Sequence, residues 1–304
     1  KCLAEGRVLS AALYALFVDE CLRDVHKSGH GYYLPNPTSG DGFVGALACA
    51  DDVAAIPRDL DDLPGLMAVI GAFTERHMQK HGHKKTIILL FRPNPHAPSY
   101  PTEQQLRVPL SALTGSTSFI RYRDEDGQLF QQSKYLGMLL HVSMSWGPHL
   151  DQITIPKIRT RLAALKSAVT SNSLLSPPSC MMLLEIDVLS CLRYGAELWG
   201  VSPLLRDACD YSSTLDTLDS LFLVFLRECA SLQGERSLDI AIFKELGWSG
   251  VLGVTMTSQV RFLHAVLRMP PHRPPRIALL SGISRLQGNL DSHCLPLPST
   301  LSTK

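Results

Sequence analysis

Hydrophobic residues repeat with a helical period at two places in the first third of the chain. Apolar residues recur every four positions from Leu9 to Cys21, which predicts an amphipathic helix that ends near Gly29. A second apolar stripe over 60–80 predicts another helix, with Pro64 in its first turn. Both helices are expected to bury one face.

Short apolar runs with strand character lie between and after these helices. FVGALACA at 43–50 and VAAI at 53–56 predict two strands joined at an acidic pair. TIILLF at 86–91 predicts a buried strand. Further along, 119–130 predicts a hairpin and 135–144 another strand.

From His149 onward only helical periodicity remains. Apolar stripes predict helices over 155–169, 179–194, 215–232 and 258–268. The last residues are rich in Pro and Ser and lack periodicity. The sequence therefore predicts an α+β fold, with a mixed domain at 1–145, a helical region at 146–269 and a loose Pro/Ser-rich tail at 270–304.

Composition and charge narrow the class of protein without indicating an activity. The chain is 45% hydrophobic and 19% charged, with a net charge of +1. No stretch approaches the roughly 18–20 uninterrupted apolar residues that span a bilayer, so we expect no membrane partner. The eight cysteines form no C-x-x-C pair, which favours reduced thiols and an intracellular protein. The chain begins with Lys and lacks a signal peptide, so we expect a longer parent protein.

Asp51 and Asp52 stand side by side between two apolar runs. Burying either carboxylate unpaired would cost on the order of several kcal/mol, so we expect both at a hairpin tip, projecting from the sheet. A divalent cation would remove their repulsion, and Mg²⁺ prefers such oxygen ligands together with water and substrate phosphates. A solvent-exposed turn is the alternative, because Asp is common in turns. The pair alone does not decide between them.

Two basic stretches offer a surface for phosphates. Lys157, Arg159, Arg161 and Lys166 lie on the helix predicted over 155–169. Between 251 and 290 there are five arginines and no acidic residue. Such clusters bind nucleic-acid phosphates in some proteins and are solvated faces in others.

The order of these segments resembles the reverse transcriptase domain of non-LTR retrotransposons. In that family a motif of the type QG-x-x-LSP-x-LF opens a long helix, and an A-D-D hairpin follows. Here the helix opening reads EGRVLSAALYALF from Glu5, and the hairpin reads ACADDVAAI around Asp51 and Asp52. Both segments stand in the family's order.

Later segments continue this order. KKTIILLF from Lys84 is similar to the family's Lys-Thr or Lys-Ser before a strand, and YLGMLL from Tyr135 to its primer-gripping segment. YGAELWG from Tyr194 and ELG from Glu245 are similar to the region beyond the palm. The resemblance covers roughly 1–270. It implies a partial polymerase palm, an antiparallel sheet with packed helices, followed by an all-helical thumb-like region.

The resemblance also implies roles for individual residues. Asp51 and Asp52 would be catalytic and would bind two Mg²⁺ ions for nucleotidyl transfer from a dNTP to a primer 3′-hydroxyl. The other implied residues are substrate-binding Gly6, Arg7, Ser10 and Lys85; a primer grip of Tyr135, Leu136 and Gly137; and nucleic-acid-binding Lys157, Arg159, Arg161 and Lys166. The implied partners are an RNA template, a DNA primer and dNTP.

Several departures from the family bear on activity. In the family, a further aspartate on a strand before the first helix completes the metal site, but this chain begins after that point and lacks the fingers as well. Glu5 stands where Gln is usual, and Ala11 where Pro is frequent. Glu185 and Asp187 have similar apolar flanks, but they fall on a predicted helix. We interpret the chain as a fragment of an RNA-directed DNA polymerase that lacks the N-terminal part of its parent polyprotein and is inactive alone.

Other interpretations stay open. A non-catalytic or vestigial nucleic-acid-binding protein derived from a retroelement would keep the fold pattern without activity. An unrelated Mg²⁺-dependent phosphohydrolase would use Asp51 and Asp52. A zinc site at His77, His81 and His83 has ligand spacing on a helix but no fourth ligand nearby. We expect an intracellular protein, nuclear if it is expressed as part of a retroelement.

Overall fold

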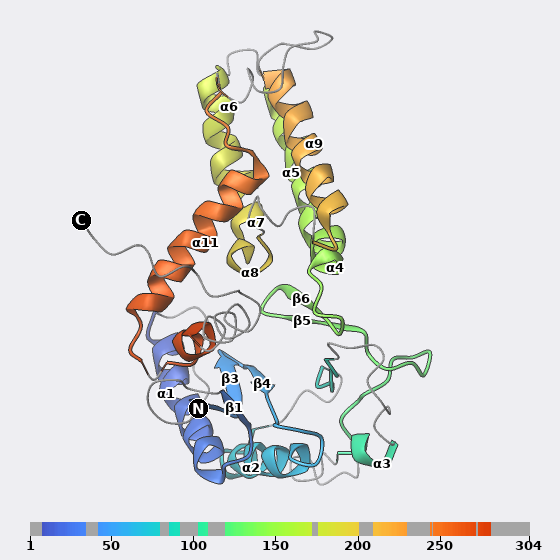
Figure 1. The fold of residues 1–304 in the computed structure, drawn as a ribbon, viewed down its shortest axis with the longest axis vertical. Coiled ribbons are helices and arrows are strands. Elements are labelled where there is room, and N and C mark those ends of the chain that lie inside the picture. Colours follow the sequence, from blue (N-terminus) through green and yellow to red (C-terminus); the bar gives the residue numbers. More distant parts are fainter. Residues whose placement is uncertain are drawn as a thin grey trace, which may run out of the picture. The chain divides into compact units, whose positions relative to one another are not determined.

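The structure is a computed structural model of the chain (Figure 1). It describes residues 8–34, 42–79, 85–91, 103–108, 119–171, 176–200, 209–229, 244, 246–271 and 273–280. Contacts divide the chain into two compact units. The first unit comprises 1–88, 98–129 and 266–304, and the second comprises 89–97 and 130–265. Each unit has its own hydrophobic core.

Two helices, α1 (Val8–Ser28) and α2 (Leu63–Arg76), pack against each other in the first unit. α1 ends where predicted, because Gly29 takes a left-handed φ of 73° that stops the helix. α2 has Pro64 in its first turn, as predicted, but ends short of residue 80. The facing sides of the two helices bury Cys21, Val25, Leu66, Ile70 and Phe73.

Short antiparallel hairpins lie beside these helices. β1 (Tyr32–Leu34) pairs with β2 (Gly42–Val44), and β3 (Ala46–Cys49) pairs with β4 (Asp52–Ala55). The run predicted as one strand over 43–50 is therefore two strands in different sheets. The strands separate at Gly45, where the backbone packs so closely that a Cβ atom would lie 2.8 Å from the His30 carbonyl oxygen.

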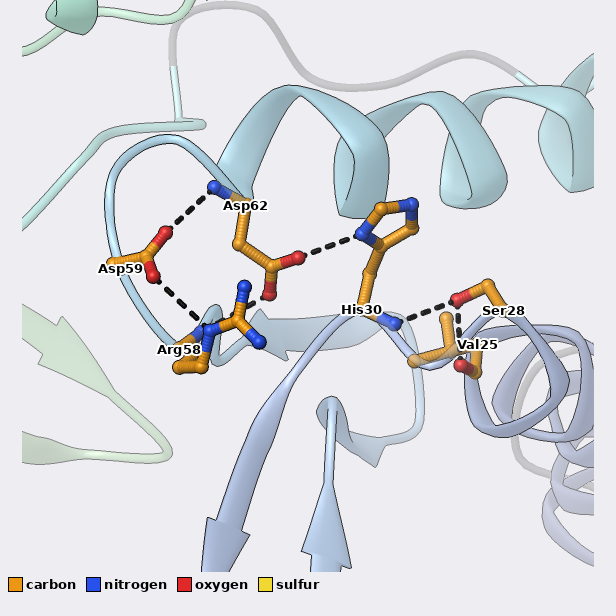
Figure 2. A network of polar contacts seen from close by, with 6 residues as sticks. All are labelled: Val25, Ser28, His30, Arg58, Asp59 and Asp62. Carbon is orange, nitrogen blue, oxygen red and sulfur yellow. Dashed lines mark hydrogen bonds and ion pairs between the residues drawn. The ribbon is translucent and has the colours of Figure 1, made fainter.

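A buried carboxylate fixes the start of α2 (Figure 2). Asp62 is 7% exposed; one of its oxygens lies 2.6 Å from His30 Nδ1, and the other accepts the Arg58 backbone N–H at 3.2 Å. Burial raises the pKa of Asp62, but the hydrogen bonds from His30 and Arg58 outweigh it, so that the net pKa is lowered. Asp59 closes the network by accepting the Asp62 backbone N–H at 2.9 Å.

Extended segments complete the first unit beside the short helix α3 (Glu103–Leu106). The Ile120 N–H donates to the Val108 carbonyl at 3.0 Å, and the Ile88 N–H donates to the Arg121 carbonyl at 2.8 Å. Val108 and Ile120 are buried together with Leu63 in a small separate cluster. These bonds hold three segments, distant in sequence, side by side.

The prediction of a buried strand over 86–91 is wrong. In the described segment 85–91, the one β-bridge is that of Ile87 to Arg121. An apolar run forms a strand only where a neighbouring backbone pairs along it, and here the pairing is limited to one residue. The predicted turn near Asp126 is present, because the Asp124 N–H donates to the Gln128 carbonyl at 2.8 Å.

The second unit combines one hairpin with a series of helices. The hairpin consists of β5 (Gln132–Tyr135) and β6 (Met138–His141), so the segment predicted as one strand over 135–144 is instead a turn followed by a strand. The helical elements are α4 (Gly147–His149), η2 (Leu150–Thr154), α5 (Ile155–Ser171), α6 (Pro177–Leu183), η3 (Leu184–Val188), α7 (Leu189–Arg193), α8 (Ala196–Trp199), α9 (Ser212–Cys229) and α11 (Gly250–Arg268).

The core of the second unit follows the predicted helical stripes. On α5, Ile155, Ile158 and Leu162 are buried, as the sequence period requires. Among the residues that the structure describes, Trp199 and Phe222 are the largest side chains that are completely buried. Together with apolar residues of η3, α7 and α9 they form one continuous cluster.

At the coarse level the predicted α+β class is confirmed, because helices are combined with small antiparallel sheets. The division between the units differs from the predicted boundary at residue 146. The hairpin before this point belongs to the second unit, since Met138 lies in the helical core. Among the described helices, none has the length and apolar character needed to cross a membrane.

The tail predicted to start at residue 270 also differs from the structure. Residues 274–280 are helical, and Ile277 is 3% exposed. A Cβ atom at Gly42 would lie 2.9 Å from the Ile277 side chain. An apolar contact with β2 therefore orders the beginning of a segment whose composition alone indicated a loose tail.

His149 is a buried, neutral histidine in the second unit. It is 1% exposed; its Nδ1 accepts the Leu139 N–H at 3.1 Å, and its Nε2 lies 3.3 Å from Thr154 Oγ1. Because Nδ1 is an acceptor, the ring proton belongs on Nε2. Burial, with a smaller contribution from the charge of Lys157, lowers the pKa of His149 to about 4.

This histidine predicts a loss of stability in acid. The unfolded histidine titrates near its usual pKa of about 6.5, so the stabilisation is complete above that pH and declines toward pH 4, by at most roughly 3 kcal/mol. The tryptophans at 146, 199 and 248 all lie in the second unit, so tryptophan fluorescence during urea unfolding reports on it. We expect His149→Gln to lack this component of the pH dependence. Parallel pH curves for the wild type and the variant would contradict the assignment.

Candidate functional site

The acidic hairpin carries both carboxylates at its tip. The register pairs Cys49 with Asp52, which leaves Ala50 and Asp51 as the two turn residues. Both aspartates are exposed, so neither charge is buried. The hairpin tip predicted for this pair is therefore present in the structure.

The turn itself is strained. Ala50 has a positive φ of 50°. This left-handed conformation costs a residue with a Cβ atom roughly 1–2 kcal/mol, which is why glycine usually takes it in two-residue hairpin loops. Strained turns of this kind persist where the surrounding structure holds them, and they occur often at functional sites.

The two faces of the hairpin have different surroundings. Ala46 and Ala55, which are partners in the register, pack against the core of α1 and α2. The opposite face carries Leu47, Cys49 and Asp52, all exposed. Because side chains alternate along a strand, the packing of the alanines directs Asp52 away from the helices and into water.

Tyr14 on α1 is a neighbour of the acidic tip that the sequence reasoning missed. Burial raises the pKa of Tyr14, and the negative charge of Asp51 raises it further, while a hydrogen bond with Gln79 lowers it in part. The phenol therefore keeps its proton and can donate a hydrogen bond to an anion. Tyr14 lies one helical turn after Ser10, in the segment that resembles a helix-opening motif. This spacing could have identified Tyr14 from the sequence, because residues four apart share a helix face.

The two carboxylates fit one hydrated Mg²⁺ ion better than a pair of ions. Mg²⁺ commonly binds through one or two carboxylates and keeps several waters, whereas a two-ion site about 3.5–4 Å across needs more ligands. Among the residues that the structure describes, no group of three or more Asp, Glu, His or Cys side chains could hold a metal ion. Glu185 and Asp187 lie in η3, where they pair with arginines of their own unit. Asp51 and Asp52 thus have no third carboxylate beside them in the described part.

The other predicted substrate-binding residues are not joined to this tip. Gly6 and Arg7 lie outside the described residues, and of Ser10 only the place in α1 is described. Lys85 is exposed. Within the described segments, no hydrogen bond or ion pair connects it to the hairpin.

The predicted zinc site gains no support. His81 and His83 lie outside the described residues. The His77 ring packs against Phe17 and Phe73, with centroid distances of 4.8 and 4.6 Å. Its surroundings are those of a histidine at the edge of a helical core.

Two of the motif segments meet in the second unit. Tyr135 ends β5, and the turn that follows consists of Leu136 and Gly137, with φ of 49° and 78°. The Tyr194 hydroxyl donates to the Leu136 carbonyl, and Gly195, with a φ of 71°, lets the chain approach β6 closely. The segment predicted as a primer grip therefore forms a strained turn, and the segment YGAELWG contacts it.

The predicted nucleic-acid-binding helix is α5, and its basic residues have different surroundings. Arg161 pairs with a carboxylate of η3, and Lys166 pairs with one of α9 at 2.5 Å. Lys157 and Arg159 are exposed. Part of the predicted basic cluster thus holds the helices together, and its remaining charges face water.

Comparison with known protein families, with functionally characterised proteins and with solved structures finds no match to this chain. The resemblance to reverse transcriptases therefore depends on the order of the sequence motifs alone.

The strained turn predicts an unusual response to glycine. Ala50→Gly should stabilise the first unit by about 0.5–1 kcal/mol, because relief of the left-handed strain exceeds the added entropy of the unfolded chain. Ala48→Gly, on a strand of the same hairpin, is the matched control and should destabilise by about 0.5–1 kcal/mol. Hydrogen exchange of the hairpin amides measures both changes. A loss of protection in both variants would contradict the strained turn.

Proposed function

We propose that the chain is a nucleic-acid-binding module related to the RNA-directed DNA polymerases of non-LTR retrotransposons, with a partial palm in the first unit and a thumb-like second unit. The observation that carries this proposal is the acidic hairpin. Two adjacent, exposed carboxylates lie at the tip of a strained two-residue turn that rests on a helical core. The motif order around the hairpin supports the same relation.

In this proposal the hairpin carboxylates hold a hydrated Mg²⁺ ion. When bound, the ion supplies positive charge that attracts and orients phosphate oxygens. Asp52 approaches it from the outward face of β4, and Asp51 from the turn. Tyr14, whose pKa burial and the charge of Asp51 raise, would donate its hydroxyl proton in a hydrogen bond to a phosphate held at the tip.

The second unit would contact the nucleic acid through its turn and its exposed cations. The Leu136–Gly137 turn projects backbone groups at a fixed position, because Tyr194 holds the carbonyl of Leu136. Lys157 and Arg159 on α5 provide exposed positive charge. Such charges contribute affinity for phosphates without reading sequence.

We further infer that the isolated chain does not polymerise. Nucleotidyl transfer by two ions needs ligands shared between them, and the described residues offer two carboxylates without a third. In the alternative form of the proposal, the chain is a non-catalytic or vestigial nucleic-acid-binding protein derived from a retroelement. Both forms of the proposal have a nucleic-acid partner. They differ in whether the chain catalyses nucleotidyl transfer.

Binding of an RNA–DNA hybrid with a recessed DNA 3′ end tests the nucleic-acid partner. We expect Mg²⁺ to strengthen binding several-fold, and Asp51→Asn/Asp52→Asn to abolish this Mg²⁺ effect while strengthening binding in EDTA, because two negative charges are removed. Fluorescence anisotropy measures both effects. Glu125→Gln/Asp126→Asn removes a second exposed acidic pair in the same unit and should leave the Mg²⁺ effect intact. Absence of hybrid binding by the wild type would refute the proposal.

Primer extension tests the absence of polymerisation. With a labelled primer on an RNA template, dNTPs and Mg²⁺, we expect no extension by the wild type beyond that of Asp51→Ala, because the described residues offer two carboxylates without a third. Gel analysis after long incubation at high protein concentration gives the necessary sensitivity. Extension that disappears in Asp51→Ala would show that the described residues do not include all of the metal ligands.

A further inference from the structure

The segment 119–123 alternates between the core and water. Ile120 is 2% exposed and belongs to the small buried cluster of the first unit. Phe119, Arg121 and Arg123 are exposed, and in an extended chain residues two apart share a face. Bridges at positions 121 and 123 show that the segment is extended. Its outer face therefore presents one aromatic ring and two guanidinium groups in a row.

A neighbouring segment adds a cation to this face. The Arg107 guanidinium carbon lies 5.2 Å from the centroid of the Phe119 ring, which is a cation–π contact. Ile87 bridges Arg121 in the parallel direction, and Lys85 lies two residues before this single bridge. Lys85 is exposed. Two segments, 103–108 and 119–123, thus bring positive charge to one face.

Part of this charge has no acidic partner. Among the ion pairs of the described residues, none involves Arg107 or Arg123. Arg123 donates instead to the neutral Gly127 carbonyl at 2.6 Å. The nearby Asp124 side chain is engaged in its own turn, where it accepts the Gln128 N–H at 2.9 Å. The face is therefore cationic.

We propose that this strip, formed by Arg107, Phe119, Arg121 and Arg123, binds single-stranded nucleic acid. The cations attract successive phosphates, and the ring with its stacked guanidinium offers flat surfaces on which unpaired bases stack. Phe119 is 42% exposed although Arg107 covers part of it, so the ring remains accessible to a base. Binding of a single strand at this strip depends on the proposed function only in that the partner is a nucleic acid.

The strip distinguishes a single strand from the other polyanions that its charge would attract. In a duplex the faces of the bases are already stacked, so an exposed aromatic ring gains nothing from them. An acidic polypeptide would use the arginines but not the ring. Dependence on Phe119 is therefore the property that separates these partners.

Anisotropy of a labelled oligo(dT) or oligo(U) strand with the full chain in EDTA tests the strip. We expect Phe119→Ala to weaken binding at least about 5-fold and Phe119→Tyr to leave it unchanged. Arg107→Gln/Arg123→Gln should lower the slope of log affinity against log salt by roughly 1.4, since each contact contributes about 0.7 on a single strand. Arg23→Gln, an exposed arginine paired with Asp19 on α1, is the matched control and should not change the slope.

The result that would overturn the strip is unchanged single-strand affinity in Phe119→Ala and Phe119→Leu, each with a wild-type circular dichroism spectrum. Equal weakening of poly-L-glutamate and oligonucleotide binding in Phe119→Ala would also overturn it, because an acidic polypeptide does not use the ring. Failure of the proposed function has a different signature. The strip could bind single strands in EDTA while Mg²⁺ and the Asp51/Asp52 substitutions have no effect on hybrid binding. That result would support single-strand binding by the strip and refute the role of a metal ion at the acidic hairpin.

Discussion

The packing of α1 against α2 determines where the acidic hairpin lies. Each apolar side chain fully buried between the helices contributes roughly 1.5–3 kcal/mol, and the hairpin rests on this core through two alanines. Because alanine is small, the sheet lies close to the helices and its other face is left to water. The core also includes Cys21, whose thiol pKa is raised to about 11 by burial and neighbouring acids, so it stays protonated and packs as an apolar group.

The same principle governs the hairpin of the second unit. There the support is Tyr194, whose hydroxyl holds the carbonyl of a turn residue. Leu136 in this turn and Ala50 in the acidic hairpin both have a left-handed backbone that costs energy for residues other than glycine. In each case packing elsewhere in the unit compensates the local strain. Both turns are segments to which the sequence resemblance assigns a functional role.

Elements that depend on local periodicity were predictable from the sequence. The end of α1 at Gly29, the proline at the start of α2 and the apolar stripe of α5 follow from spacing and backbone chemistry alone. The exposed acidic tip was predictable for an energetic reason, since two adjacent charges cannot be buried without partners.

Features that depend on contacts between distant segments were not predictable. The separation of β2 from β3 follows from the close approach of Gly45 to His30, and the lack of a strand at 86–91 follows from the lack of a partner along its length. The left-handed Leu136 runs against residue preference. Two further features depend on the fold bringing distant segments together: the closeness of Tyr14 to Asp51, and the basic strip around Phe119.

The claim that Asp51 and Asp52 hold a divalent ion is tested most directly by metal-directed cleavage of the chain. With Fe²⁺ in place of Mg²⁺, and with ascorbate and peroxide, hydroxyl radicals form at the ion and cut the nearest backbone, and mass spectrometry locates the cuts. We predict cuts within the hairpin at 46–55 and in α1 around Tyr14, suppressed by excess Mg²⁺ and absent from Asp51→Asn/Asp52→Asn. Cuts that lie elsewhere, or that persist unchanged in the double variant, would contradict the claim.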